Sequence, residues 1–304
     1  MLFEDIMSGG KGGHKGGHPV DPVPTVIPDP VTYERAGGDG FRTLWVIFVI
    51  FIASAALFSL QAWRIPVSRR VYHVLTTVIT IVGALSYFAM ASGSASALNC
   101  HSVTDHHNKV PNTHHDVCRQ VFWSRYVDWA ITTPLLLVEL GLLAGLDGAH
   151  IAMAVFADLV MVFSGLFSAL GEKHTSQTWG WFTIAVIAYI FVIWHIAVEG
   201  SMVVKARGER LTKLFGSLAG FILILWAIYP IIWGIAQGGH RMSVDAEIIT
   251  YAVLDMLTKV VFGFWILISN RQIPETIAEV GGWWSHGLNT NPEGRIRIGN
   301  GGEA

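Results

Sequence analysis

Two ionisable residues lie inside an apolar run near the end of the chain. Asp255 and Lys259 fall within the stretch from Tyr251 to Ser269, which is otherwise suited to a membrane span. A charged side chain at mid-membrane costs roughly 2.5–3.5 kcal/mol on insertion scales, so such a residue suggests a functional site. Being four residues apart, the two side chains share one helix face and can form an ion pair. Either this pair is structural, or Lys259 forms a Schiff base with a carbonyl cofactor and Asp255 is part of its counterion.

A second set of ionisable residues lies in the run from Arg125 to Glu139. Arg125 precedes Asp128 by three residues, and Thr132 follows Asp128 by four. Glu139 follows Asp128 by eleven residues, which returns to within about 20° of the same helix face, roughly 16 Å along the axis. One helix therefore presents a file of proton-capable groups through a membrane. Carboxyl groups at two depths indicate proton transfer, because a structural ion-pair network would not need that spacing.

The composition is that of a membrane protein. Hydrophobic residues make up 52% of the 304 residues and charged residues 14%, against roughly 25% charged in soluble domains. The sequence predicts an all-α membrane protein, a seven-transmembrane-helix bundle with no room for a second domain. A net charge of −2 gives no indication of nucleic-acid binding. The apolar runs of membrane-spanning length lie near residues 43–62, 71–92, 120–143, 149–170, 179–198, 212–236 and 246–269.

Lysine and arginine collect in alternate loops. The loops after the first and fifth runs carry Arg64, Arg69, Arg70, Lys205, Arg207, Arg210 and Lys213. The positive-inside rule puts these loops in the cytoplasm, the N-terminus outside and the C-terminus inside. The composition predicts a disordered extracellular tail over residues 1–41, a seven-helix domain over 42–270 and a cytoplasmic tail over 271–304. In that last tail, Trp283 and Trp284 could anchor the chain at the membrane interface.

The longest connection between runs, from Ser92 to Arg119, holds both cysteines, Cys100 and Cys118. In an extracellular loop these two could form a disulfide, although their positions alone leave the question open. The same loop carries histidines whose spacing fits no closed zinc pattern, so we predict no metal site. These histidines are His101, His106, His107, His114 and His115.

Motifs on three of the runs together resemble those of the microbial rhodopsins, and within them the fungal opsins. They are Arg125-Tyr-Val-Asp-Trp129 with Thr132-Thr-Pro134, then Trp226-Ala-Ile-Tyr-Pro-Ile-Ile-Trp233, and Leu254-Asp255 with Lys259. The resemblance covers about residues 42–270. It implies all-trans retinal bound to Lys259 as a protonated Schiff base, with Asp128 and Asp255 as counterions.

The resemblance also implies a role in proton transfer for each matching residue of the third run. Asp128 would be the primary proton acceptor, held by Thr132, and Arg125 would stabilise the counterions. Glu139, buried among leucines towards the cytoplasm, would be the internal proton donor and would keep its proton until the Schiff base needs it.

Further matches concern proton release and the retinal pocket. Glu247 matches one carboxylate of an extracellular release pair, but the other position falls in Gln237-Gly-Gly239, which has no acid. Asp158 would be structural and hydrogen-bonded to Thr133, and one tryptophan of Trp179-Gly-Trp181 would face the polyene. The residues implied or considered as retinal contacts are Tyr87, Trp129, Thr133, Met161, Gly165, Trp226, Tyr229 and Trp233.

The motifs bear on three functions from different classes. A light-driven outward proton pump, which is an ion translocator and not an enzyme, is favoured because carboxyl groups occupy the acceptor and donor positions, Asp128 and Glu139. The alternative is a slow-photocycle sensory photoreceptor that signals through a partner, since Thr258 precedes the lysine and could bond to Tyr229. A non-photochemical receptor or transporter is disfavoured by the joint motifs. Chloride and sodium pumps of the family would lack an aspartate at position 128.

The expected partners are retinal, protons and a lipid bilayer, with the plasma membrane as the expected location. Whether the chain forms a homo-oligomer, or binds a signalling partner as a sensor would, is left open by the sequence.

Overall fold

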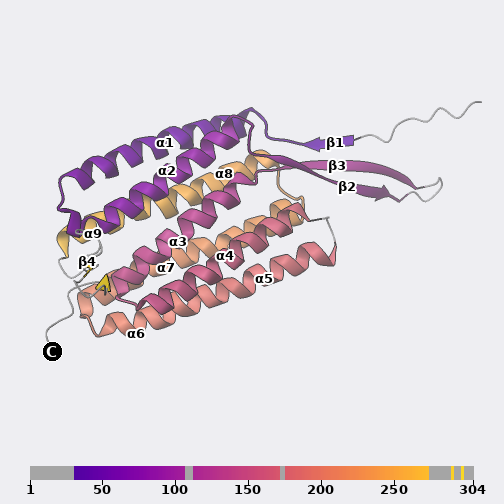
Figure 1. The fold of residues 1–304 in the computed structure, drawn as a ribbon. Helices are drawn as coiled ribbons and strands as arrows, with labels where there is room; N and C mark the ends of the chain where they lie inside the picture. Colours follow the sequence, from indigo (N-terminus) through magenta and orange to yellow (C-terminus); the bar gives the residue numbers. More distant parts are fainter. Residues whose placement is uncertain (1–30, 107–111, 172–174, 274–288, 291–295, 298–304) are drawn as a thin grey trace, which may run out of the picture.

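The computed structural model describes residues 31–106, 112–171, 175–273, 289–290 and 296–297. Within these ranges, 7 helices are long and apolar enough to cross a membrane, which confirms the predicted seven-helix membrane bundle. Figure 1 shows the helices packed side by side, with β-strands extending from one end of the bundle. Residues 1–30 and the predicted anchor Trp283-Trp284 lie outside the described residues.

The first spans are continuous α-helices, and the later ones contain π-helical stretches. The continuous spans are α1 (Gly38–Trp63), α2 (Val71–Ala91), α3 (Ser124–Ala144) and α4 (Gly148–Leu170), with a 3₁₀ turn at Val67–Arg69 between α1 and α2. The fifth span runs from α5 (Ser176–Ile193) through a π-helical stretch (Trp194–Glu199) into α6 (Gly200–Lys205). The sixth is α7 (Glu209–Trp233), which ends in a π-helical stretch (Gly234–Gly238). The seventh runs from α8 (Val244–Asp255) through Met256–Val261, also π-helical, into α9 (Phe262–Gln272).

The turn between α3 and α4 shows how local sequence sets the helix boundaries. Gly145 ends α3 with φ of +81°, a left-handed conformation that a glycine adopts without a Cβ clash. The Asp147 side chain then caps α4, because its Oδ1 accepts hydrogen bonds from the backbone N–H groups of Ala149 (2.9 Å) and His150 (3.0 Å). These bonds, the one from His150 first, hold the pKa of the Asp147 carboxyl below its usual value.

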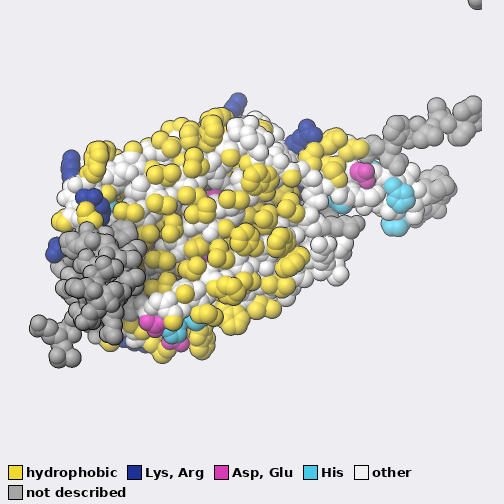
Figure 2. All heavy atoms as spheres, viewed as in Figure 1, with side chains coloured by type: hydrophobic (Ala, Val, Ile, Leu, Met, Phe, Trp, Pro, Cys, Tyr) yellow, Lys and Arg dark blue, Asp and Glu magenta, His cyan; other side chains and the backbone are white. Residues whose placement is uncertain are grey.

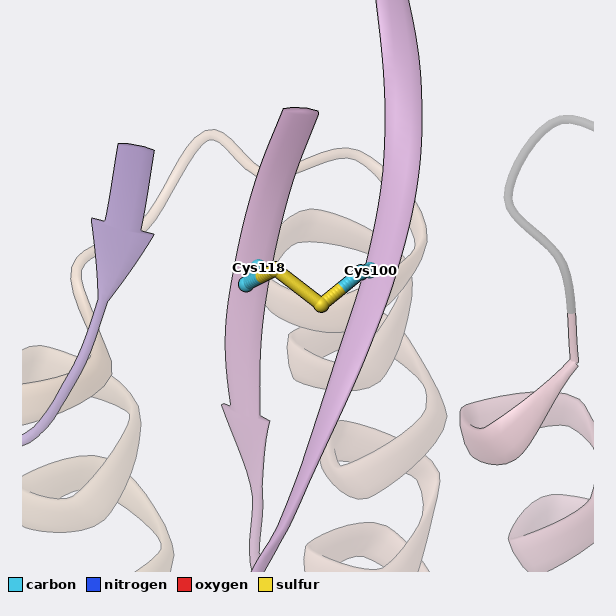
Figure 3. The surroundings of a disulfide bond; sticks show 2 residues. All are labelled: Cys100 and Cys118. Atoms are coloured by element: carbon cyan, nitrogen blue, oxygen red, sulfur yellow. A yellow bond between two sulfur atoms is a disulfide. The ribbon is translucent and has the colours of Figure 1, made fainter. Parts of the chain in front are cut away.

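A small β-sheet at one end of the bundle was not predicted from the sequence. β2 (Ala97–Asp105) and β3 (Thr113–Val121) form an antiparallel hairpin, in which Cys100 lies opposite Cys118. The two cysteines form a disulfide, which settles the pairing that their sequence positions left open (Figure 3). We refer below to the end of the bundle that carries this sheet as the hairpin end.

The N-terminal strand β1 (Val31–Glu34) joins the sheet beside β3, in parallel orientation. A second contact fixes the start of α1, since the backbone N–H of Gly37 donates to Asp245 Oδ1 at 2.6 Å. The prediction of a disordered tail is therefore wrong for residues 31–41. The composition of this segment gave the wrong prediction because the strand that orders it lies far along the chain, with Val31 opposite Asp116.

Apolar side chains cover the outside of the bundle as well as its interior. Figure 2 shows hydrophobic side chains spread over the flank of the helices, with charged side chains near the ends. Large residues such as Leu85, Phe156, Ile190 and Ile224 are more than half exposed there. An apolar surface of this extent suits contact with lipid, which makes the chain a multi-pass membrane protein.

Candidate functional site

Lys259 lies in the interior of the bundle, in the π-helical stretch between α8 and α9. Its Nζ forms an ion pair with Asp128 Oδ2 of α3 and lies 3.6 Å from Asp255 Oδ1. All three side chains are 1% exposed. The structure thus brings together the lysine and both carboxylates that the sequence analysis singled out. Burying three charges is costly unless they compensate one another. A helix that only packs against its neighbours would not need such a cluster, so the cluster indicates a functional site.

Asp255 is held by donors from three other helices. Tyr87 OH of α2 donates to Oδ2 at 2.8 Å, and Tyr229 OH of α7 donates to Oδ1 at 2.9 Å. Trp129 Nε1 of α3 lies 3.3 Å from the same Oδ1. Hydrogen bonds to an ionised acceptor are the strong ones, so these donors stabilise Asp255 as a carboxylate beside Lys259.

Asp128 has fewer partners than Asp255. The Thr132 hydroxyl, expected to hold this side chain, donates to the backbone carbonyl of Asp128 at 2.8 Å and also interacts with its carboxyl group. Asp128 Oδ1 has no hydrogen-bond partner among the described residues. Of the two carboxylates beside Lys259, Asp128 is therefore the one with an oxygen that accepts no hydrogen bond within the described ranges.

Glu139 lies further along α3, on the side of Lys259 away from the hairpin end, and is wholly buried. Thr76 Oγ1 of α2 donates to its Oε1 at 3.0 Å. Its other oxygen has no partner in the described part of the chain, and the same holds for the Tyr72 hydroxyl and both ring nitrogens of His73. A buried carboxylate with a single neutral donor would be costly, so this environment suits an acid that stores a proton.

Towards the hairpin end, Arg125 points away from Lys259. Its guanidinium donates to Glu247 Oε1 at 3.0 Å and stacks over the Tyr251 ring, 4.4 Å from the centroid. Glu247 also accepts from Arg119 Nη2 at 2.7 Å and from Gln237 Nε2 at 2.9 Å. Arg125 and Glu247 were predicted as site residues. Arg119 was not, because an arginine in a polar loop gives no local signal.

A mostly apolar cavity starts at Lys259 and extends between α3, α4, α5 and α7. Seven of the eight residues proposed from the sequence as retinal contacts line it: Trp129, Thr133, Met161, Gly165, Trp226, Tyr229 and Trp233. The eighth, Tyr87, lies behind Asp255, to which it donates. Lining residues that the sequence analysis missed include Tyr251 and, on α5, Phe182, Ala185, Val186 and Tyr189.

The expected tryptophan on the fifth span does not line this cavity. Neither Trp179 nor Trp181 is among the lining residues. Phe182 takes that place and stacks on Trp233, with ring centroids 4.9 Å apart and an interplanar angle of 20°. The prediction was wrong because two neighbouring tryptophans leave the helix register undetermined, and the ring that faces inward is the residue after them.

The cavity fits an elongated apolar group with one polar attachment point. Aromatic rings form its walls, and the amine of Lys259 with its carboxylates lies at one end. Gly165 lines the wall without a side chain, and a Cβ there would meet the Tyr126 ring at 3.4 Å. A polyene aldehyde matches these features in shape, in polarity and in its chemistry towards an amine.

Other predicted polar residues have structural contacts. Thr133 Oγ1 donates to Asp158 Oδ2 at 2.6 Å, which confirms the expected pair between α3 and α4. His195, in the π-helical stretch of the fifth span, lies 3.1 Å from His150 through their Nδ1 atoms. Over the described ranges, no group of three or more His, Cys, Asp or Glu side chains is arranged to hold a metal ion.

Comparison with known proteins agrees with this geometry. A family profile described as Bacteriorhodopsin-like protein matches residues 42–273. Opsin-1 of Neurospora crassa is 58% identical over 283 residues, which cover 93% of this chain and 92% of Opsin-1. The crystal structure of the light-driven proton pump LR (Mac) from Leptosphaeria maculans is 52% identical, with a TM-score of 0.79 over 81% of this chain and 99% of that chain.

A more distant structure gives the same assignment. The light-driven proton pump CsR of Coccomyxa subellipsoidea is 33% identical, with a TM-score of 0.71 over 78% of this chain and all 100% of that chain. The family implies a retinal chromophore bound through a lysine, and the buried amine beside the aromatic cavity is that of Lys259. The chain therefore belongs to the bacteriorhodopsin-like family of membrane proteins, and within it to the fungal opsins.

Proposed function

We propose that this protein is a light-driven outward proton pump, with Asp128 as proton acceptor and Glu139 as proton donor. The observation that carries the proposal is the position of two carboxyl groups on one helix, α3, on either side of Lys259. Asp128 is in contact with the lysine amine, and Glu139 is buried towards the opposite end of the bundle. The relatives LR and CsR are described as light-driven proton pumps, which are ion translocators and not enzymes.

The residues around Lys259 have different roles in proton transfer. Lys259 would hold all-trans retinal as a Schiff base, and the retinal would supply the absorption of visible light and the change of shape that weakens the hold of the lysine nitrogen on its proton. Asp128 accepts that proton because it touches the nitrogen and has an oxygen without a partner. Asp255 keeps its negative charge because its donors stabilise the carboxylate, as described above. Glu139 then returns a proton to the lysine nitrogen from the other side.

The direction of transport follows from which end of the bundle faces the outside. The hairpin end carries the Cys100–Cys118 disulfide, and such bonds persist in oxidising, extracellular surroundings. The arginine-rich connection between α1 and α2 lies at the opposite end, where the positive-inside rule expects the cytoplasm. A proton that passes from Glu139 to Asp128 then moves outward. We place the N-terminus outside, the C-terminus in the cytoplasm and the protein in the plasma membrane.

A slow sensory photoreceptor is the second candidate, and one contact favours it. The Thr258 hydroxyl, next to Lys259 in the chain, lies 3.4 Å from Tyr229 OH. However, Tyr229 OH has its closer contact, 2.9 Å, with Asp255. The two carboxyl groups on either side of Lys259 favour the pump as the account of the whole site.

The test is light-driven transport by intact cells that express the full chain with added retinal. Illumination should acidify the medium, and a protonophore should abolish the signal. Asp128→Asn should remove transport while the pigment still forms. Asp158→Asn is the matched control, because it neutralises a buried aspartate of α4 that bonds to Thr133 and not to Lys259. Pigmented wild-type cells that leave the pH unchanged in steady light would refute the pump.

A further inference from the structure

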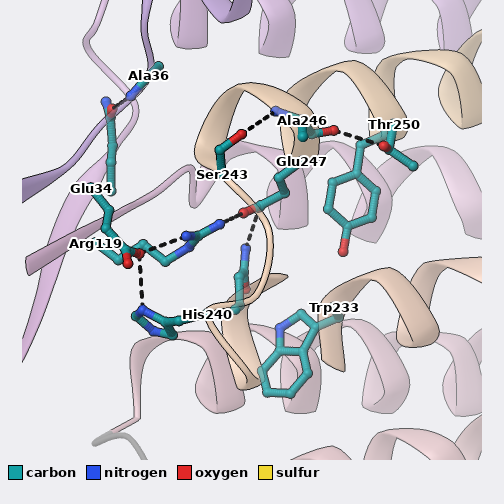
Figure 4. Close-up of polar contacts among 12 residues, drawn as sticks. Glu34, Ala36, Arg119, Trp233, His240, Ser243, Ala246, Glu247 and Thr250 are labelled. Atoms are coloured by element: carbon teal, nitrogen blue, oxygen red, sulfur yellow. Dashed lines mark hydrogen bonds and ion pairs between the residues drawn. The ribbon is translucent and has the colours of Figure 1, made fainter. Parts of the chain in front are cut away.

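A chain of charged side chains runs from the interior of the bundle to its hairpin end. Beyond the Arg125–Glu247 contact, Arg119 bridges two carboxylates, 2.7 Å from Glu247 Oε2 and 2.7 Å from Glu34 Oε2 (Figure 4). His240 Nδ1 lies 3.0 Å from the same Glu34 oxygen. Exposure rises along this chain, from 2% for Arg119 and Glu247 to 11% for His240 and 30% for Glu34. The cluster therefore connects the buried site to the medium.

The N-terminal strand supplies Glu34 to this cluster. Glu34 is the last residue of β1 and pairs in register with Arg119 of β3. The chain has Gln237 and two glycines where the resemblance would place a second release carboxylate. A carboxylate from outside the seven-helix domain thus stands near a position where the helices themselves provide none.

His240 is held in a conformation that favours glycine. Its φ is +50°, in the left-handed region that glycine adopts most easily. The two residues before it are glycines, Gly238 and Gly239, yet the histidine has this conformation. Its backbone N–H donates to the carbonyl of Ala236 at 3.1 Å, which closes the π-helical end of the sixth span. Strained backbone of this kind persists where the surroundings fix it, often at functional positions. In this backbone conformation the imidazole of His240 is in contact with the Glu34 carboxylate.

A small cavity with both polar and apolar walls adjoins the same residues. Arg119, Gln237 and His240 lie in its wall, together with Asn99 and His101 of β2. Its volume of about 20 Å³ is enough for one water molecule. A proton leaving the imidazole would therefore have a polar acceptor position next to it.

We propose that His240, paired with Glu34 of the N-terminal strand, releases a proton to the medium early in each turnover. This inference rests on the proposed pump and names its exit group. In the dark, the imidazolium is stabilised by the Glu34 carboxylate, and imidazole is the side chain that changes charge between pH 5 and 8. The N–H bond of His240 breaks, its electron pair stays on the ring nitrogen, and the proton passes to water. Later in the turnover Asp128 gives up its proton and His240 regains one, both by way of water, because the arginines between them carry none.

Electrostatic coupling, not proton hopping, links the two ends of the chain. Arginine does not give up its proton, so Arg119 and Arg125 cannot carry one. When Asp128 takes the proton from Lys259, one positive charge moves towards Arg125 and the hairpin end. The ion pairs through Glu247 pass this change on to Glu34 and its imidazolium, which lowers the hold of His240 on its proton.

Several groups besides Glu34 face His240. The guanidinium of Arg119 shares the Glu34 oxygen and disfavours a charged imidazole. The His101 ring of β2 packs edge-on, with centroids 5.0 Å apart, and Arg241 is the next residue in the chain. Glu34 is the carboxylate in contact with the ring, so its removal should shift the balance towards neutral imidazole.

The experiment follows the proton with a pH-sensitive dye after a light flash on the full-length pigment. The wild type at neutral pH should release a proton before the Lys259 nitrogen is reprotonated. His240→Asn should lose this early release, and asparagine tolerates the positive φ at that position. His115→Asn is the matched control, because His115 Nδ1 lies 2.8 Å from Asp105 Oδ2, a similar pair further out on the hairpin. It should behave as the wild type does.

A pH series separates a proton carrier from a purely structural ion pair. In Glu34→Gln, His240 should lose its proton in the dark more readily, so early release should vanish at a lower external pH than in the wild type. A structural pair would change stability without moving this midpoint. Unaltered early release in His240→Asn, or none in the wild type at any pH, would overturn the inference. Failure of the pump itself is distinguishable, since the wild type would then not acidify the medium in steady light.

Discussion

Replacing Glu139 by glutamine removes the stored proton while keeping the shape of the side chain. Glutamine can still accept the hydrogen bond that Thr76 Oγ1 donates at 3.0 Å. Because Glu139 lies eleven residues beyond Asp128, about 16 Å along α3, the dark absorption spectrum should hardly change. Return of the proton to the Lys259 nitrogen should become slow and should depend on the pH of the medium.

The expected slowing of reprotonation follows from the interaction that each substitution removes. A positioned acid contributes about 10²–10⁴-fold to a proton transfer, so Glu139→Gln should slow reprotonation by a factor in that range. Thr76→Val removes only one hydrogen bond to Glu139, worth about 0.5–1.5 kcal/mol. That energy changes a rate by about two- to thirteenfold. The glutamine variant should therefore be at least about eightfold slower than the valine variant.

Flash spectroscopy at several pH values measures these rates as the recovery of the dark absorption. Added azide, a small diffusible acid, should restore fast recovery in Glu139→Gln and have little effect on the wild type. A wild type that recovers slowly, together with Glu139→Gln that changes nothing, would show that Glu139 is a passive buried acid. The sensory function, with Thr258 and Tyr229 as its switch pair, would then be preferred.

Three further changes test the site and its packing. Lys259→Ala should abolish the pigment, since the covalent bond needs that amine; covalently bound retinal in the purified variant would contradict the assignment. Asp128→Asn should shift absorption to the red and stop transport, because an amide stabilises a positive charge less and takes up no proton; acid titration of the wild type should give the same shift. Gly263→Ala puts a Cβ 2.5 Å from Thr76 Cγ2, so overpacking of about 1–3 kcal/mol should lower the melting temperature and disturb reprotonation through Glu139.

Features that depend on local pattern were predictable from the sequence. The apolar run near 71–92 became α2, which ends at Ala91, because the length of a membrane span shows in consecutive residues. Asp128, Asp255 and Lys259 were found because a charge in an apolar run is costly and therefore visible. Their meeting in space follows from the motifs, since no local pattern gives the distance between the third and seventh spans.

Features that depend on distant pairing were missed. Glu34 and Arg119 lie in polar segments, where a charge gives no signal, and their contact joins residues 85 positions apart. The composition around Glu34 predicted a tail, and only its partner strand shows otherwise. Phe182 was missed for a different reason. The side chain that faces the cavity depends on the rotation of α5, which a helix that is apolar on all sides does not reveal.

The contrast between the two halves of the bundle has an electrical consequence for the proposed pump. Around Glu139 the buried polar groups are uncharged neighbours with few hydrogen bonds, whereas the hairpin end is a chain of charges. The membrane voltage should therefore fall mostly across the Glu139 half. One elementary charge moved through 100 mV requires about 2.3 kcal/mol, and the step of about 16 Å covers roughly half of a 30 Å hydrocarbon core.

An inside-negative potential of that size would oppose the Glu139 step by about 1.2 kcal/mol, or roughly sevenfold in rate, if the field were uniform. The opposition is larger when the voltage falls mostly across the Glu139 half. Proton release at the hairpin end, which crosses little of the field, would be almost unaffected. The voltage that transport builds up therefore slows the transfer of a proton from Glu139 to the Lys259 nitrogen more than it slows proton release. As the membrane charges, this transfer should limit the rate of turnover.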